Sequence, residues 1–195
     1  MVEHLPTLML ARARGISLPL MGPNKHLRSE HGLGIGKLQI FGDDAAVLFR
    51  HFVGVDAPAA GRQLNKSGAT FAWLSPNEWL LVGPEQDVAA WLASLDALGA
   101  DALLAVDLSH ARASFLLTGA GAGDVLAALC PLDLWTELFP VDAVARSLLG
   151  DASMFIARLA DLADGPQWRI VVDQTMAGYA ARMLAGPINH RGTQS

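Results

Sequence analysis

The chain has 195 residues and a formal net charge of −5, with 52% hydrophobic residues and only 17% charged ones. A chain of this length fits one domain, or two small lobes that share a core. Its acidity and the lack of a large Lys/Arg cluster argue against nucleic-acid binding, and no apolar run approaches the ~20 residues of a membrane-spanning helix.

The remaining composition bears on compartment and surface. Cys130 is the single cysteine, which excludes an internal disulfide framework. The apolar stretch around Leu8 and Met9 is too short for a signal peptide, so we expect a soluble, cytoplasmic protein. The mean hydropathy of +0.32 is high for a soluble monomer. We therefore expect another polypeptide to cover part of an apolar surface, although a merely Ala- and Leu-rich core remains an alternative.

The chain begins with a stretch that has no sustained hydrophobic period. Prolines interrupt it at three positions, and glycines follow at 32, 34 and 36. We expect residues 1–35 to form an irregular N-terminal arm, residues 36–186 a single two-lobed domain, and residues 187–195 a tail.

The first lobe covers residues of about 36–110. Alternation of apolar and polar residues from Lys37 to Phe41 is typical of a half-buried strand, and Asp43 or Asp44 can cap the helix that follows. In chain order we expect a strand at 37–41, a helix that starts at Asp43 or Asp44, strands at 69–74 and 78–82, a helix at 87–98, and a strand at 102–108.

The second lobe, residues of about 111–186, repeats this order. We expect a strand at 113–118, a helix at 124–129, a longer connection at 134–145, strands at 146–149, 154–159 and 168–172, and a last helix capped by Thr175. Each lobe is thus roughly β-α-β-β-α-β. The pattern predicts an α+β fold of two ferredoxin-like lobes, with antiparallel sheets and helices on one face.

Several residues suggest chemistry that their spacing does not support. Asp107, Ser109 and His110 are the residue types of a hydrolase triad, but close neighbours on a strand alternate between its faces. We expect a turn in which Asp107 or Ser109 binds local backbone N–H groups. The two glycine clusters lack the spacing of a dinucleotide loop and are assigned to turns, and the histidines and Cys130 lack metal-ligand spacing. We therefore expect no catalytic, cofactor-binding or metal-binding residue.

An interface accounts better for the aromatic and methionine content. The chain has five tryptophans and six methionines but one tyrosine, and Trp, Met and Arg are enriched at protein contacts. Any one tryptophan could equally lie in the core. The candidates for a partner interface are Trp73, Trp79, Trp135, Arg112, Leu8 and Met9.

Three tracts carry a resemblance to a known family. Residues 73–82, residues 106–119, and residues 130–135 with the following Phe139 and Pro140 together resemble the gamma subunit of heterotetrameric sarcosine oxidase. The resemblance extends from about Gly36 to about Leu184. It implies a fold similar to the folate-binding domain of aminomethyltransferases. The arm before Gly36 matches poorly, and the stretch at 154–164 is longer and more acidic than the family leads us to expect.

The resemblance also implies a function. In such a complex the gamma subunit is a non-catalytic accessory chain beside larger flavin- and folate-binding subunits, which carry FAD, FMN, NAD and tetrahydrofolate. The complex oxidises sarcosine to glycine, an oxidoreductase reaction on a CH–NH donor, with hydrogen peroxide and a one-carbon unit as the other products. A first alternative is a free-standing folate-binding one-carbon protein related to aminomethyltransferases, with Trp73, Trp79 and Tyr179 available to contact a pterin. A second is a homodimeric structural protein.

Overall fold

The computed structural model describes residues 18–22 and 24–189 and has the expected α+β fold. Its strands form two antiparallel sheets, one of six strands and one of five. His31–Arg112 and Asp142–Arg146 form one unit, here called the five-stranded unit. The other described residues, 18–22, 24–30, 113–141 and 147–189, form the six-stranded unit.

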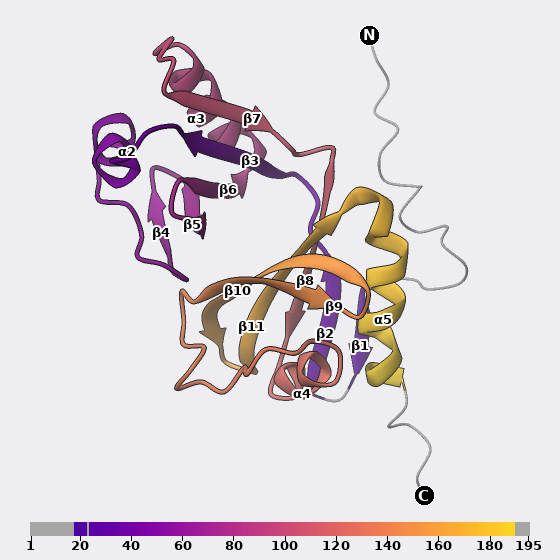
Figure 1. The fold of residues 1–195 in the computed structure, drawn as a ribbon. Coiled ribbons are helices and arrows are strands. Elements are labelled where there is room, and N and C mark those ends of the chain that lie inside the picture. Colours follow the sequence, from indigo (N-terminus) through magenta and orange to yellow (C-terminus); the bar gives the residue numbers. More distant parts are fainter. Residues whose placement is uncertain (1–17, 23, 190–195) are drawn as a thin grey trace, which may run out of the picture. The chain divides into compact units, whose positions relative to one another are not determined.

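In the five-stranded unit the strands lie in the order β4-β5-β6-β3-β7 (Figure 1). The elements in chain order are β3 (Leu33–Ile40), α2 (Ala45–Val53), β4 (Gln63–Lys66), β5 (Ala69–Ser75), β6 (Glu78–Pro84), α3 (Glu85–Asp96) and β7 (Leu103–Asp107). Both helices cover one face of this sheet, because the same buried cluster contains Phe49 of α2, Val88 of α3 and Leu38 of β3. The predicted strands and helices of the first lobe are all present, and β4 is an addition.

Helix α3 packs closely against β3, and two glycines make this possible. A Cβ atom added to Gly34 would lie 2.7 Å from Val88, and one added to Gly36 would lie 2.9 Å from Leu92. Both glycines are inside β3, so their assignment to a turn was wrong. The absence of a side chain here serves a close helix–strand approach.

The six-stranded sheet has the order β1-β2-β8-β11-β10-β9 (Figure 1). Its strands are β1 (Leu20–Gly22), β2 (Lys25–Ser29), β8 (Arg112–Thr118), β9 (Val144–Leu149), β10 (Ala152–Leu162) and β11 (Gly165–Asp173). The remaining helical elements are α4 (Ala122–Ala127), the 3-10 turn η1 (Gln174–Met176) and α5 (Ala177–Asn189). Helix α5 contacts β1, β2, β11 and α4. The stretch at 154–164, expected to depart from the family, forms most of β10 and its turn into β11, with an irregular register between Leu159 and Leu162.

The two sheets repeat one strand order. The five-stranded sheet has the order β4-β5-β6-β3-β7, and this order corresponds strand for strand to β9-β10-β11-β8-β2 in the six-stranded sheet. Gly42 and Gly119 follow the matching strands β3 and β8, each with a left-handed φ, of 126° and 106°. Trp79 is the second residue of β6 and Trp168 is the fourth residue of the matching strand β11, and both are buried. The repeated lobes predicted from the sequence are therefore present.

The N-terminal arm was predicted wrongly over its second half. Residues from Leu20 onward form β1, β2 and the start of β3. Strand β2 pairs with β8, from His26↔Thr118 to Ser29↔Phe115, in the place that β7 occupies beside β3. The second lobe thus takes its last strand from the N-terminal segment. Leu27 is the single buried apolar residue of this polar strand, so periodicity gives almost no signal for it.

Candidate partner interface

The three tryptophans proposed for an interface lie in different environments. Trp79 is 1% exposed and packs against Phe49 with a ring-centroid distance of 4.7 Å, so it belongs to the core and cannot face a partner. Its assignment to an interface was wrong. Trp73 is partly buried and pairs with Trp79 across β5 and β6. Trp135 is 74% exposed and is the one tryptophan of the five in the exposed class.

The other three interface candidates give less information. Arg112 starts β8, is partly buried, and donates from Nη1 to the carbonyl oxygen of Ala111 at 3.5 Å. Leu8 and Met9 lie outside the described residues. Of the four proposed residues that the structure describes, Trp135 is therefore the one presented to solvent as a large apolar side chain.

Trp135 begins a tight turn in the connection between α4 and β9. Its carbonyl oxygen accepts hydrogen bonds from the backbone N–H groups of Leu138 at 2.9 Å and Phe139 at 2.7 Å. Its own N–H donates to Oδ1 of Asp133 at 3.2 Å. The turn exposes Trp135 and Leu138, the latter by 67%, whereas Phe139 is only 7% exposed. One short segment therefore presents two large apolar side chains and buries a third.

Phe139 anchors this turn in the six-stranded unit. Its ring lies 5.6 Å from that of Trp168, centroid to centroid. Trp168 in turn has the Arg158 guanidinium 5.0 Å from its ring centroid, a cation–π contact. Arg158 is 3% exposed, donates to the carbonyl oxygen of Leu159 at 2.8 Å, and forms an ion pair with Asp161. The base of the turn is thus fixed by a stack of buried side chains.

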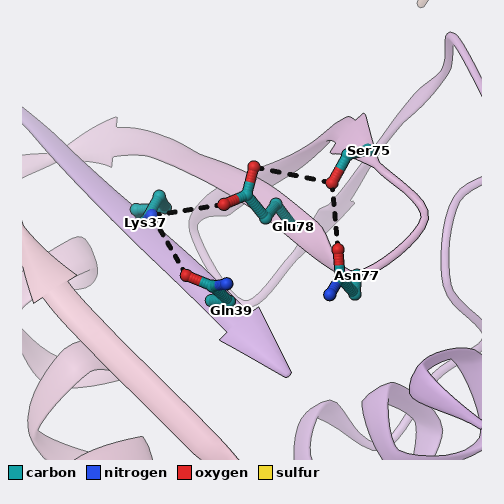
Figure 2. A network of polar contacts seen from close by, with 5 residues as sticks. All are labelled: Lys37, Gln39, Ser75, Asn77 and Glu78. Atoms are coloured by element: carbon teal, nitrogen blue, oxygen red, sulfur yellow. Dashed lines mark hydrogen bonds and ion pairs between the residues drawn. The ribbon is translucent and has the colours of Figure 1, made fainter. Parts of the chain in front are cut away.

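A polar network joins β3 to the β5–β6 hairpin (Figure 2). Lys37 donates to Oε1 of Glu78 at 3.3 Å and to Oε1 of Gln39 at 3.2 Å. Ser75 Oγ lies 3.5 Å from Oε2 of Glu78 and 3.2 Å from Oδ1 of Asn77, and donates to these oxygens. Both carboxylate oxygens of Glu78 are thus engaged within the protein. The network ties a hairpin to its neighbouring strand.

Asp107 and Ser109 form the turn that was predicted in place of a triad. Oδ1 of Asp107 accepts from the backbone N–H of Ser109 at 2.8 Å. The Ser109 hydroxyl accepts from the N–H of Ile35 at 3.0 Å. Hydrogen bonds from Ser109 hold the pKa of Asp107 below its usual value. Both side chains serve the backbone, which confirms the structural interpretation.

A buried ion pair in the six-stranded unit was not predicted. Arg169 on β11 donates to both carboxylate oxygens of Glu30, from Nε at 2.8 Å and from Nη2 at 3.0 Å. Ser114 on β8 adds a hydrogen bond of 2.7 Å from its hydroxyl. Burial alone would raise the pKa of Glu30, but Arg169, Ser114 and the nearby charge of Arg28 together lower it. This pair could not be predicted from local sequence patterns, because its two residues are 139 positions apart.

The described part of the chain has neither a metal-binding cluster nor a membrane-spanning helix. Within residues 18–22 and 24–189, no three His, Cys, Asp or Glu side chains converge as a metal site would require. Over the same residues, no helix combines the length and the apolar character needed to cross a bilayer.

Comparison with known proteins identifies the fold. A chain of the heterotetrameric sarcosine oxidase from Corynebacterium sp. U-96, in complex with pyrrole 2-carboxylate, matches with a TM-score of 0.77 and 26% identity, over 91% of this chain and 90% of that chain. The glycine cleavage system aminomethyltransferase T from Bartonella henselae matches with a TM-score of 0.65 over 84% of this chain and 46% of that chain. Its identity of 19% establishes a shared fold alone.

Sequence comparison gives the family. Sarcosine oxidase subunit gamma from Corynebacterium sp. strain U-96 is 33% identical over 134 residues, which cover 67% of this chain and 62% of the relative. The subunit of the same name from Corynebacterium sp. strain P-1 is 33% identical over 95 residues, 48% of this chain and 46% of the relative. This chain thus spans less than two thirds of the curated relatives it matches. Residues 42–186 match the model of the sarcosine oxidase, gamma subunit family, and the chain belongs to that family.

Proposed function

We propose that this chain is the accessory gamma subunit of a heterotetrameric sarcosine oxidase and holds no reaction centre of its own. The observation that carries the proposal is the match of nearly the whole chain to one chain of a heterotetrameric sarcosine oxidase, at a TM-score of 0.77. The internal arrangement of polar groups supports it. The carboxylates of Glu78, Asp107 and Glu30 each accept hydrogen bonds from other residues of this chain.

The reaction then belongs to the partner subunits. In the proposed complex, a flavin held by a partner subunit would supply the two-electron oxidation of the N-methyl group of sarcosine, by accepting one hydride equivalent from a methyl C–H bond. Oxygen would take up the two electrons and become hydrogen peroxide, and the oxidised one-carbon unit would pass to tetrahydrofolate, leaving glycine. FAD, FMN, NAD and tetrahydrofolate are assigned to the larger chains. We place the complex in the cytoplasm, where a chain with the single thiol Cys130 needs no oxidising environment.

The proposed contribution of this chain is architectural. This chain exposes large apolar side chains such as Trp135 and Leu138, and a larger neighbouring subunit could bury them. Obligate complexes bury large apolar areas, so the chain should associate non-specifically when it is purified alone.

The folate-binding alternative has a shared fold in its favour but loses support from the aromatic residues. Trp79 is buried in the core. The hydroxyl of Tyr179 accepts a hydrogen bond from the backbone N–H of Asp151 at 3.1 Å, so it already has a partner. Trp79 is therefore excluded as a pterin contact, and the Tyr179 hydroxyl already serves the backbone.

A co-purification experiment tests the proposal. The full chain with an affinity tag is co-expressed with the flavin-bearing subunits encoded by the same organism. We expect capture of a stoichiometric complex with flavin absorbance and sarcosine-dependent peroxide formation, whereas the chain alone has neither. Turnover of sarcosine by the isolated chain would contradict the proposal, and so would failure to capture any flavin-bearing chain. Quenching of tryptophan fluorescence by tetrahydrofolate in the isolated chain would support the alternative.

A further inference from the structure

The connection between α4 and β9 departs from the repeat that the two sheets share. It covers residues 128–143, whereas its counterpart between α2 and β4 covers only residues 54–62. Long connections without helices or strands in a folded domain commonly carry a function. The longer connection contains the turn of residues 133–138, here called the Trp135 turn.

The Trp135 turn and the residues just after it expose large apolar side chains. Trp135 and Leu138 are 74% and 67% exposed, and Val141, three residues further on, is 40% exposed. A tryptophan side chain can bury 150–250 Å², roughly a quarter of what one partner contributes to a standard interface. Tryptophan is also among the residues whose truncation most often weakens a complex.

Contacts within this chain hold the Trp135 turn in place. Backbone hydrogen bonds to the carbonyl oxygen of Trp135 close it, and Phe139 fixes it against Trp168. A partner that binds the turn therefore has little backbone to immobilise, which favours affinity.

The charged side chains of this connection are of one sign. Asp133 and Glu137 are exposed, and residues 128–143 contain no Lys or Arg. A partner surface that fits must then combine an apolar pocket with basic residues at its rim. A second copy of this chain is a poor fit, because a two-fold contact through the same surface would set these carboxylates against each other.

We propose that the Trp135 turn docks into an apolar pocket, rimmed by Lys and Arg, on a larger chain of the complex. The inference rests on the proposed function, because that function supplies the larger chain. Trp135 and Leu138 fill the pocket, and Asp133 and Glu137 pair with its basic rim.

The test measures binding of the purified full chain to the remaining subunits, expressed together without it. We expect Trp135→Ala to raise Kd by about thirty-fold or more, the effect of a hot-spot residue, and Leu138→Ala to raise it by about five- to ten-fold. Leu98→Ala is the matched control, because Leu98 is 52% exposed but lies in the five-stranded unit. Its Kd should equal that of the wild type.

A charge variant tests the basic rim separately. Asp133→Lys combined with Glu137→Lys should weaken binding about ten-fold or more at low salt and reduce its dependence on salt concentration. Circular dichroism should show each variant folded, since the altered side chains are exposed.

The possible outcomes distinguish failure of the docking proposal from failure of the proposed function. If the wild-type chain binds the larger subunits but Trp135→Ala binds as tightly, the docking inference is refuted and the proposed function stands. A Leu98→Ala variant that weakens binding as much as Leu138→Ala would also refute it. Self-association that Trp135→Ala abolishes, with binding to the larger chains unaffected, would assign the turn to a second copy. A wild-type chain that does not bind those subunits would overturn the proposed function itself.

Discussion

The ion pair between Glu30 and Arg169 gives a stability prediction that follows directly from geometry. Glu30→Gln keeps the shape of the side chain and removes the charge that Arg169 faces. Only 9% of the Glu30 side chain and 15% of the Arg169 side chain are exposed, so the remaining guanidinium would be largely uncompensated. Removal of one member of a buried pair lowers the free energy of unfolding by about 3–5 kcal/mol. Because glutamine still accepts a hydrogen bond and Arg169 retains some contact with water, we expect about 2–3 kcal/mol.

Urea denaturation of the full chain at neutral pH measures this loss. Ser114→Ala is the comparison, since it removes one hydrogen bond to the carboxylate and leaves the ion pair, for a loss of about 1–2 kcal/mol. A loss below about 1 kcal/mol for Glu30→Gln would refute the reasoning, because the pair would then be no stronger than an exposed salt bridge.

The same pair makes stability depend on pH. The folded-state pKa of Glu30 is lowered, so its carboxylate contributes stability that is fully present above the unfolded-state pKa of about 4.3. That stability is lost as the pH falls through the folded-state pKa. Between neutral pH and the acid range, wild-type stability should therefore decrease more steeply than that of Glu30→Gln. Equal slopes for the two proteins would contradict the assigned direction of the pKa shift.

Two further predictions concern the backbone. In thermal denaturation, Gly119→Ala should lower the free energy of unfolding by about 2 kcal/mol or more, since φ is 106° and the new Cβ would lie 2.3 Å from the carbonyl oxygen of Asn24. Gly123→Ala is the control, because Gly123 lies on α4 with open space around it, and this variant should be neutral or stabilising. Asp107→Ala should cost about 1 kcal/mol in urea at neutral pH by freeing the N–H of Ser109, and the difference from wild type should vanish at a pH below the lowered pKa of Asp107; a difference that persists in acid would rule out the carboxylate as the acceptor that matters.

Local patterns were enough to predict most of the five-stranded unit. Alternation at Lys37–Phe41, turn residues at Ser75 and Asn77, and helical spacing from Val88 to Leu95 each describe an element that is contiguous in the chain. Such elements are determined by which side chains face the core, and this information is present in neighbouring residues.

The features that were predicted wrongly or not at all depend on contacts between residues that are distant in the sequence. Strand β2 is polar and short, and its backbone hydrogen bonds to β8 hold it in the sheet. Trp79 is of a residue type that is enriched at interfaces, but its position in β6, where it packs against Phe49, buries it. Trp135 was recognised as a candidate, whereas Leu138 was not, because only the turn geometry exposes both while burying Phe139.

The insertion of β2 beside β8 has a consequence for synthesis on the ribosome. Leu27 pairs with Leu117, so the nascent chain must grow by roughly 90 residues before this strand finds its neighbour, a delay of about 5–20 s at typical elongation rates. Meanwhile His31–Arg112, almost a complete folding unit, has already emerged and can collapse. The leading strand therefore waits as a free edge, and a chaperone or an early-arriving assembly partner has that interval in which to shield it.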